Sequence, residues 1–537
     1  METSKKQESS ISSFDRSKSY WNEAIPQTSP FPTLAENLET DVVIIGGGLA
    51  GVSTAYCLSK AGKKIVLVED GNIGSGETGH TTAHLVTALD DRFTHFVKLF
   101  GKEDTRLILQ SHQAAIDFVE KTVKEEKIDC QFSRLPGFLF RHPSDDKEVL
   151  TDEFDAATEA GLELKILDRI PGMMNNQEAC LEFPDQAQFH PLLYLHGLCK
   201  AIEKQGGKIY TNTHAAIINA DGIITEDGWI IKADDIVVAT NSPVNDLVTI
   251  HLKQNAFRTY VIAGPVEKDS VPHALWWDTG DHDVNKDFPP YHYVRLFPFN
   301  DESDLLISGG EDHPTGDLPK EDHNEATRFQ RLESWTREHF PLKEITYHWS
   351  GQVMEPVDSL AFIGKNPMDK ENVYIITGDS GTGMTHCTIG GLLICDLIMG
   401  IDNPWERIYR PSRMTFSSSP VFFRSLMRGI KGLLTATPGD DRVKELEAVN
   451  PGEGKICQID GHRCGVYNDP HGAMNIVSAK CTHLGAALHW NDAEKSWDCP
   501  WHGSRFAPDG QVINGPANRN LPLYTLSDEI PLERKGE

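Results

Sequence analysis

Four short, continuously apolar runs along the chain predict buried parallel strands. They lie within residues 41–45, 64–69, 236–239 and 373–377, where the charged residues stand only at the ends. Parallel strands are covered on both faces, so their sequences are apolar throughout instead of alternating. Helical stretches lie between them, and an apolar helix is expected to run to about Met399 after the last strand. This order of elements predicts an α/β domain.

Other segments alternate between apolar and polar positions. The stretches 258–263 and 291–296 have this two-residue period, which is typical of antiparallel strands with one face covered. We expect regions 130–175 and 255–345 to build an antiparallel α+β substrate domain whose sheet lies over the α/β domain.

A linker is expected at residues 406–450, between the main domain and the C-terminal region. Within it, apolar residues at 422, 423, 426, 427, 430, 433 and 434 have helical spacing, with the basic residues off the apolar stripe. Packing on the main domain or on a partner subunit is the favoured interpretation. An interfacial membrane helix is the alternative. Residues 1–37 are expected to form an N-terminal arm, docked through Trp21 and the Pro-Phe-Pro at 30–32.

Two mixed pairs near the C-terminus, Cys481-Thr-His483 and Cys499-Pro-Trp-His502, supply two thiols and two imidazoles. Thiolates suit one iron of a [2Fe–2S] cluster, and imidazoles on the other iron define the Rieske arrangement. Zinc sites usually have closely spaced cysteines and closely spaced histidines instead of mixed pairs. A disulfide would leave both histidines unexplained. We therefore predict that these four residues are the metal ligands of a [2Fe–2S] cluster.

With glycines in both loops and a Gly515-Pro516 turn, residues 451–537 resemble the Rieske iron–sulfur family, which implies an all-β domain. Ala486 and Trp501 stand where respiratory and photosynthetic members have a loop-bridging disulfide, and Phe506 replaces a tyrosine. Fewer hydrogen bonds to sulfur stabilise the reduced cluster less. The potential is expected in the lower part of the Rieske range of about −150 to +300 mV.

The first apolar run ends in Gly46-x-Gly48-x-x-Gly51, and the second ends at Glu69. Glycines let the backbone approach a pyrophosphate, the helix N-terminus stabilises its charge, and the acid accepts a hydrogen bond from a ribose hydroxyl. Strand, glycines, helix, strand and acid in this order predict a Rossmann-like dinucleotide site. The glycine run 378–383 has no such strand and acid after it, so a single FAD and no NAD(P) domain is expected.

The small-residue run 71–83 after Glu69 resembles the second flavin contact of the D-amino-acid oxidase and glycine/sarcosine oxidase superfamily, and the resemblance extends over residues 38–405. It implies an FAD-dependent oxidoreductase, with the N-terminus of the helix after the glycine run 378–383 facing the flavin. The expected FAD-binding residues are Gly46, Gly48, Gly51, Glu69, Ser75, Gly76, Thr78, His80, Thr81, Gly381, Gly383, Met384 and Thr385.

The stretch containing His80 is similar to the place where dimethylglycine and sarcosine dehydrogenases attach FAD through a histidine, although Gly79 stands where those relatives have Trp. A covalent histidyl-flavin is one interpretation, and a histidine that hydrogen-bonds near the flavin is the other.

On the substrate side, family members often hold a substrate carboxylate with an Arg or Tyr of the covering sheet, and a guanidinium matches a carboxylate well. The candidates are Arg295, Tyr293 and His292, with Tyr260 behind them; His386 follows the flavin-facing glycines. The alternative is that Arg295 pairs with an acid and the tyrosines are ordinary sheet residues.

The composition of the chain limits which classes of binding partner are expected. At 537 residues with a formal charge of −28, the chain should form several domains and is poorly suited to nucleic acid or an anionic membrane. With no export signal or long apolar run, the ten cysteines are expected to be reduced in the cytoplasm.

Together these features predict an FAD-dependent dehydrogenase of a small amine or N-alkyl amino acid. Electrons would pass from FAD to the Rieske cluster and on to a soluble acceptor. One alternative is a reductase or oxygenase in which the cluster feeds FAD. The other is a flavin oxidase whose Rieske domain only senses redox state.

Overall fold

The computed structural model describes residues 19–23, 25, 31–174, 177–245, 250–284, 289–316, 326–367, 369–413, 449–459 and 461–524. The amphipathic helix predicted at 420–434 lies outside the described residues. Among the helices that are described, none combines the length and the apolar character needed to cross a membrane.

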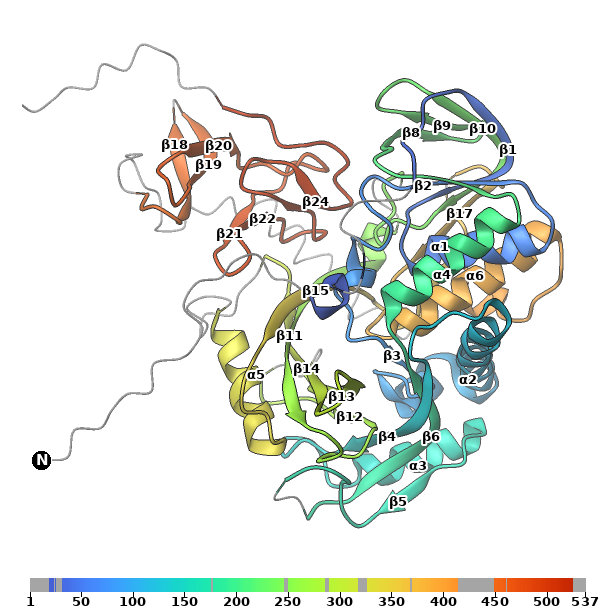
Figure 1. The fold of residues 1–537 in the computed structure, drawn as a ribbon, viewed down its shortest axis with the longest axis vertical. Coiled ribbons are helices and arrows are strands. Elements are labelled where there is room, and N and C mark those ends of the chain that lie inside the picture. Colours follow the sequence, from blue (N-terminus) through green and yellow to red (C-terminus); the bar gives the residue numbers. More distant parts are fainter. Residues whose placement is uncertain are drawn as a thin grey trace, which may run out of the picture.

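The predicted parallel sheet is present, with strand order β16-β17-β10-β1-β2-β7 (Figure 1). A hairpin attached to β10 brings this sheet to eight strands, and β16 is its antiparallel edge. The strands are β1 (Leu38–Ile45), β2 (Ile65–Val68), β7 (Lys208–Tyr210), β8 (Ala215–Asn219), β9 (Gly222–Thr225), β10 (Ile230–Val238), β16 (Phe362–Lys365) and β17 (Val373–Thr377). All four predicted runs therefore lie in one sheet, and their buried residues form its core.

Four helices gather beside this sheet (Figure 1). They are α1 (Leu49–Lys60), α2 (Arg92–Glu126), α4 (Pro191–Lys204) and α6 (Gly383–Met399). α1 contacts both α4 and α6, and α6 also contacts α2. A Cβ placed on Gly391 would lie 2.8 Å from the Ser53 backbone, so this glycine lets α6 approach α1 closely. Short helical turns occur at η1 (Tyr20–Glu23), η2 (Glu77–Gly79), η3 (His251–Lys253) and α7 (Glu406–Tyr409).

The second sheet has nine strands in the order β15-β11-β14-β13-β12-β4-β6-β3, with β5 attached to β6. They are β3 (His84–Leu85), β4 (Ser133–Phe140), β5 (Lys165–Leu167), β6 (Cys180–Gln188), β11 (Gln254–Glu267), β12 (Leu275–Asp278), β13 (Tyr293–Pro298), β14 (Ser303–Pro314) and β15 (Tyr347–Pro356). α5 (Ala326–His339) packs on β11 and β14, and α3 (Val149–Ala160) packs on α2. The sheet reaches beyond the expected regions, because β3, β6 and β15 belong to it.

The C-terminal domain is all-β, as expected (Figure 1). One sheet contains β18 (Gly454–Ile459), β19 (His462–Asn468) and β20 (Met474–Ser478). The other contains β21 (His489–Asn491), β22 (Ser496–Asp498), β23 (Arg505–Phe506) and β24 (Val512–Asn514). We call this region the cluster domain, after the four residues predicted to hold a cluster.

A buried ion-pair network joins the cluster domain to the nine-stranded sheet. Glu494, in the β21–β22 turn, is bound by Arg258 of β11 at 2.7 Å and by Arg505 of β23 at 2.5 Å. The Arg258 and Glu494 side chains are only 1% and 5% exposed. Because a buried charge without its partner is costly, this contact fixes how the two domains meet.

Candidate active site and cluster centre

A single cavity of about 1120 Å³ lies among the parallel sheet, the nine-stranded sheet and the cluster domain. Its lining begins at the end of β1, follows the run after β2, and reaches the N-terminus of α6 and the inner face of β11 and β13. The volume exceeds that of a typical small-ligand pocket, so it has room for a dinucleotide and a substrate together.

The glycines after β1 shape one part of this cavity. Gly46 and Gly48 line it, and Gly46 has φ +112°, a value that side chains rarely adopt. Gly51 does not line it; a Cβ there would lie 2.0 Å from the Gly46 oxygen, so Gly51 acts by letting α1 pack under the turn. Glu69 lines the cavity and is oriented by the backbone N–H groups of Gly47 at 2.6 Å and Gly71 at 2.9 Å. This arrangement fits the diphosphate and ribose of FAD.

The small-residue run also lies on the wall: Ser75, Gly76, Thr78, His80 and Thr81 all line the cavity. Thr78 Oγ1 accepts a hydrogen bond from the backbone N–H of Leu49, at the start of α1 (3.0 Å). The run therefore lies where it could contact the cofactor, and the contact itself stays a prediction.

Three successive carbonyl groups in this run are held by side chains from distant parts of the chain. The Gly79 oxygen accepts from Ser19 Oγ (2.5 Å), the His80 oxygen from Trp349 Nε1 (2.8 Å), and the Thr81 oxygen from Trp21 Nε1 (2.6 Å). The predicted docking of the N-terminal arm through Trp21 thus takes place on the cofactor run itself. The His80 ring lines the cavity with Nδ1 3.0 Å from the Gly76 oxygen, and its covalent link to flavin stays a prediction.

The glycine turn before α6 closes another side of the cavity. Gly381, Gly383 and Met384 line it, whereas Thr385 is buried behind them and donates to the Val86 oxygen. The N-terminus of α6 therefore points its partial positive charge at the cavity, which fits the flavin ring and the negative charge it gains on reduction.

Two of the five predicted substrate residues lie on the cavity wall. Tyr293 lines it, and its hydroxyl is 2.6 Å from Thr259 Oγ1. His386 lines it as well, with Nδ1 3.0 Å from Thr382 Oγ1. Burial, and then the neighbouring His112, lower the pKa of His386 to about 3. His386 is therefore neutral at physiological pH and suited to hydrogen bonding rather than to charge.

The other three lie off the wall, which corrects the prediction that they gather around the substrate. The Arg295 guanidinium is fully buried and donates to the Thr82, Ala83 and Phe189 carbonyls. Among the described residues, no acid forms an ion pair with Arg295 either. His292 is held by Asp278 at 2.9 Å and stacks on Trp335 of α5. Tyr260 also points toward α5 and contacts Phe329. In the described cavity, the Arg295 guanidinium is therefore not available to bind a substrate carboxylate.

Several carboxyl groups that no sequence pattern indicated lie on the same wall. Asp90, Asp312 and Asp379 line the cavity, and Tyr291 donates to Asp90 at 2.7 Å. Burial raises the pKa of Asp90 and of Asp312 to about 7, and that of Asp379 to about 6. One oxygen of Asp312 is buried and has no hydrogen-bond partner within the part of the chain that the structure describes. These groups can bind or exchange a proton near neutral pH, or pair with a cationic ligand.

The two cluster loops have matching backbone geometry. In the first, the Cys481 N–H donates to Ala486 and the Gly485 N–H donates back to Cys481, both at 2.9 Å. In the second, the Cys499 N–H donates to Ser504 at 2.8 Å and the Gly503 N–H to Cys499 at 3.1 Å. Gly485 and Gly503 have φ +78° and +77°. Each loop therefore presents one thiol and one imidazole in the same way.

The four predicted ligands converge as a Rieske centre requires. Both cysteines are buried, and the His483 and His502 rings lie 5.0 Å apart. Burial, and then the neighbouring His251 and His483, lower the pKa of His502 to about 2, which keeps it neutral as a metal ligand must be. These residues fit a [2Fe–2S] cluster with thiolates on one iron and imidazoles on the other.

The histidine edge of this centre faces the flavin-binding part of the molecule. His251 of η3 lies 5.0 Å from the His483 ring and 5.4 Å from the His502 ring. A Cβ on Gly503 would meet Ala256 of β11 at 2.2 Å and Gln352 of β15 at 3.0 Å, so this cluster loop lies directly against both strands. No sequence pattern indicates His251, because its contact with His483 and His502 forms only when the two domains pack together.

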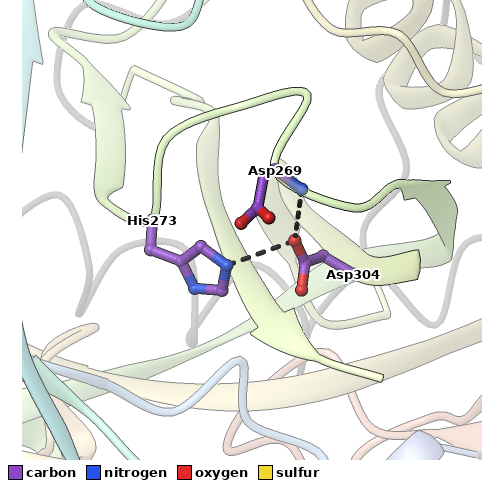
Figure 2. Close-up of side chains that lie close together, drawn as sticks. All are labelled: Asp269, His273 and Asp304. Atoms are coloured by element: carbon purple, nitrogen blue, oxygen red, sulfur yellow. Dashed lines mark hydrogen bonds and ion pairs between the residues drawn. The ribbon is translucent and has the colours of Figure 1, made fainter. Parts of the chain in front are cut away.

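A further group of side chains has the composition of a metal site (Figure 2). Asp269 and His273, in the loop between β11 and β12, lie beside Asp304 at the start of β14. However, Lys268 Nζ binds Asp304 at 2.7 Å, and His273 binds it at 3.2 Å. Although burial alone would raise the pKa of Asp304, the Lys268 ammonium holds it below its usual value. The group is therefore an ion-pair cluster that joins this loop to the start of β14.

The fold and these two centres define an FAD-dependent oxidoreductase that also holds a Rieske [2Fe–2S] cluster. The family model described as FAD dependent oxidoreductase matches residues 41–397, and the Rieske [2Fe-2S] domain model matches residues 441–525. The chain belongs to this FAD dependent oxidoreductase family and has a Rieske domain at its C-terminal side.

Individual relatives agree. The chain is 32% identical over 513 residues to a protein described as the Rieske 2Fe-2S iron-sulfur protein YhfW of Bacillus subtilis strain 168, covering 95% of this chain and 98% of that protein. It is 25% identical over 404 residues to gamma-glutamylputrescine oxidoreductase of Escherichia coli K12, covering 72% of this chain and 90% of that protein.

Among solved structures, glycine oxidase from Geobacillus kaustophilus is similar with a TM-score of 0.56 and 17% identity, covering 70% of this chain and 100% of that one. The L-proline dehydrogenase from P. horikoshii has a TM-score of 0.55 and 19% identity, with 70% and 98% covered. At these identities the likeness shows the fold.

Proposed function

We propose that this chain is a dehydrogenase that oxidises a small amine or N-alkyl amino acid and delivers the electrons, through its own cluster, to an external acceptor. The substrate loses two electrons and two protons from its C–N bond, and water hydrolyses the resulting imine. FAD, when bound, supplies the two-electron chemistry, and the Rieske cluster supplies the one-electron relay.

The observation behind this proposal is the contact between a cluster loop and the wall of the cavity. Gly503 of the cluster loop lies against Ala256 and Gln352, and both Gln352 and Phe257, the residue after Ala256, line the cavity. Only one layer of residues therefore separates the cluster loops from the expected flavin position. Electron transfer between two centres weakens steeply with their separation, so this contact supports direct exchange.

Residues of the wall can orient the substrate. The carboxyl groups of Asp90 and Asp312 can bind an ammonium group, and the Tyr291 hydroxyl fixes the position of Asp90. As Asp90 or Asp312 ionises near pH 7, it can also take the proton that makes the amine reactive. Strands β11 and β13 cover this part of the cavity, which keeps water from the reacting bond.

The charged groups on the cavity wall favour an amine substrate over a substrate that carries a carboxylate. Arg295 is turned into the core, and Arg92 of the cavity lining is paired with Asp145 at 3.1 Å. The described carboxyl groups would repel a substrate carboxylate and attract an ammonium. The relative named gamma-glutamylputrescine oxidoreductase, whose name refers to a putrescine derivative, supports the same choice.

The test is anaerobic stopped-flow of the holoprotein, with a panel of monoamines and diamines beside the matching N-methyl amino acids. Flavin absorbance reports substrate oxidation, and the EPR signal of the reduced cluster reports its reduction. We expect amines to bleach the flavin first, with the cluster signal growing afterwards. A Cys499→Ser variant should retain the first phase and lose the second.

Two results would contradict the proposal. If no amine bleaches the flavin but a reduced ferredoxin reduces the cluster and then the flavin, electrons run in the opposite direction. If the Cys499→Ser variant turns over with the physiological acceptor at the wild-type rate, the cluster is a sensor and takes no part in the electron path.

A further inference from the structure

The cluster domain forms part of the wall of the flavin cavity. Every residue of segment 511–520 except Pro516 lines the same cavity as Gly46 and Glu69. This segment comprises β24 and the loop after it, and it belongs to the cluster domain. The cavity described above is therefore completed by a domain that lies outside the FAD-binding fold.

The segment lies at the adenosine end of the cavity. Glu69, at the end of β2, marks the ribose position of a dinucleotide fold. The next residue, Asp70, pairs with His214 at 3.3 Å, and the His214 ring also hydrogen-bonds the backbone of Asn518. The side chains of His214 and Asp70 therefore connect Asn518 to the residue that follows Glu69.

Two contacts hold the segment against the FAD domain. Asn514 Nδ2 donates to Glu77 Oε1 at 2.8 Å, and the other oxygen of Glu77 accepts from the Gln352 N–H at 2.6 Å. A Cβ on Gly515 would lie 3.6 Å from Val244, so the chain here is in van der Waals contact with the loop after β10. Since Glu77 lies in the cofactor run, Asn514 ties the segment directly to that run.

The segment also brings a positive charge. Of the described cavity-lining residues, three carry a permanent positive charge: Arg92, Lys98 and Arg519. Arg92 is paired with Asp145 of the loop between β4 and α3, and Lys98 lies on the same helix as Arg92, α2. Arg519 follows Asn518, at the adenosine end. The diphosphate of FAD carries two negative charges, in a cavity whose other charged groups are mostly acidic.

We propose that segment 511–520 of the cluster domain is a component of the FAD site. It closes over the ADP half of the cofactor, with Arg519 as a counter-charge to the diphosphate and with Asn514 anchoring the segment to Glu77. Docking of the cluster domain and retention of FAD are then one linked equilibrium, because the cofactor can leave only when the segment moves away. This linkage concerns binding alone and does not depend on which substrate is oxidised.

The first test uses the wild-type protein. Amide hydrogen exchange of segment 511–520 is measured with FAD bound and after FAD has been removed. We expect this segment to be protected by FAD, while β19 and β20 of the same domain exchange equally in both states. Equal exchange of 511–520 with and without FAD would overturn the proposal.

The second test compares two charge reversals in the full-length holoprotein. Arg519→Glu lies in the cavity wall, whereas Lys480→Glu changes an exposed residue of the same domain outside it. We expect Arg519→Glu to weaken FAD binding by about tenfold or more, the size of one charge-assisted contact. Lys480→Glu should leave it unchanged. Equilibrium dialysis gives the FAD dissociation constant, and the cluster EPR signal shows whether the cluster domain remains folded.

If Arg519→Glu binds FAD as tightly as the wild type while its cluster signal is intact, Arg519 is not a counter-charge and the proposal fails. If its cluster signal is lost, the conservative variant Arg519→Gln replaces it in the same measurement. Wild-type FAD affinity in that variant would overturn the assignment equally.

Discussion

The four predicted ligands of the cluster centre come from the stretch between Cys481 and His502, whereas the flavin cavity is lined by residues from Ile45 to Asn520. In the cluster loops, backbone hydrogen bonds within each loop set the position of the ligands. In the cavity, no single segment sets the shape, since two sheets, several helices and a second domain contribute walls.

This difference determines how far a local change spreads. A change in a cluster loop alters one centre whose geometry is local, and the flavin cavity should respond only through the shared interface. A change in the walls of the cavity alters packing between elements and should affect stability and FAD binding together.

The largest effect is expected from removing one cluster ligand. Cys499→Ser should abolish the cluster, because a buried serine hydroxyl is a poor substitute for a thiolate on iron. Iron and sulfide content and the EPR signal of the reduced protein measure this loss. FAD content should decrease less than cluster content, and only as far as the loop change loosens segment 511–520.

His471→Gln is the matched control, because His471 is an exposed histidine of the same domain outside the cluster loops. It should retain the full cluster signal. A Cys499→Ser protein that still contains the cluster would refute the ligand assignment and with it the contrast between the two centres.

A glycine pair tests the packing of the cavity. A Cβ at Gly51 would lie 2.0 Å from the Gly46 oxygen, whereas one at Gly76 would meet nothing within 4 Å, and both glycines have ordinary negative φ. Gly51→Ala should therefore lower the free energy of unfolding by about 1–3 kcal/mol, and FAD binding should weaken with it. Gly76→Ala should leave the free energy of unfolding of the protein nearly unchanged.

Urea unfolding of both variants, followed by flavin fluorescence, gives the two values. Equal stability of the two variants would show that the turn can move to accept a methyl group, and that the cavity is less dependent on close packing than the structure indicates.

The smallest effect concerns pH and the wall carboxyl groups. Burial raises the pKa of Asp312 to about 7, so this group is neutral below that pH and negative above it. Binding of a permanently charged ammonium such as tetramethylammonium should therefore strengthen by about tenfold between about pH 6 and about pH 8, as one carboxyl ionises. Asp312→Asn, which cannot ionise, should reduce this pH dependence and leave only the part that Asp90 contributes.

Perturbation of the flavin spectrum by the bound cation measures its affinity in the holoprotein without turnover. A wild-type profile independent of pH would show that the carboxyl groups are already ionised, or that the cation binds elsewhere in the cavity.

The elements and cofactor residues that sequence could predict are those with a local signature. The β1–α1–β2 unit, the Glu69 position and the strand and helix around the glycine run 378–383 each depend on a short pattern with a physical reason. The four cluster residues likewise stand at fixed spacing in two loops. In these cases the residues that matter are neighbours along the chain.

The substrate residues were harder to predict, because they depend on which face of a strand meets the cavity. Successive residues of a strand point to opposite faces. His292 and Tyr293 therefore could not both face the substrate, and it is Tyr293 that lines the cavity while His292 stacks against α5. The same rule turns Tyr260 toward α5 and leaves Thr259 on the wall.

Arg295 shows a second limit. It lies two residues from Tyr293, yet its guanidinium is enclosed by backbone carbonyls and by the rings of Trp21 and Phe297. Its surroundings come from the N-terminal arm and from the residues before α4, which no local pattern connects to β13. The contact between segment 511–520 and the cavity could not be predicted from sequence for the same reason.

The three consecutive carbonyl groups at residues 79–81 have a consequence for the thermodynamics of cofactor binding. Ser19, Trp349 and Trp21 fix three adjacent peptide units of the cofactor run. The conformational entropy of this run is therefore lost when the protein folds, before FAD arrives. Binding does not have to order these residues again, so more of the contact energy is left for affinity. A chain shortened past Trp21 would shift part of that entropy loss from folding to binding.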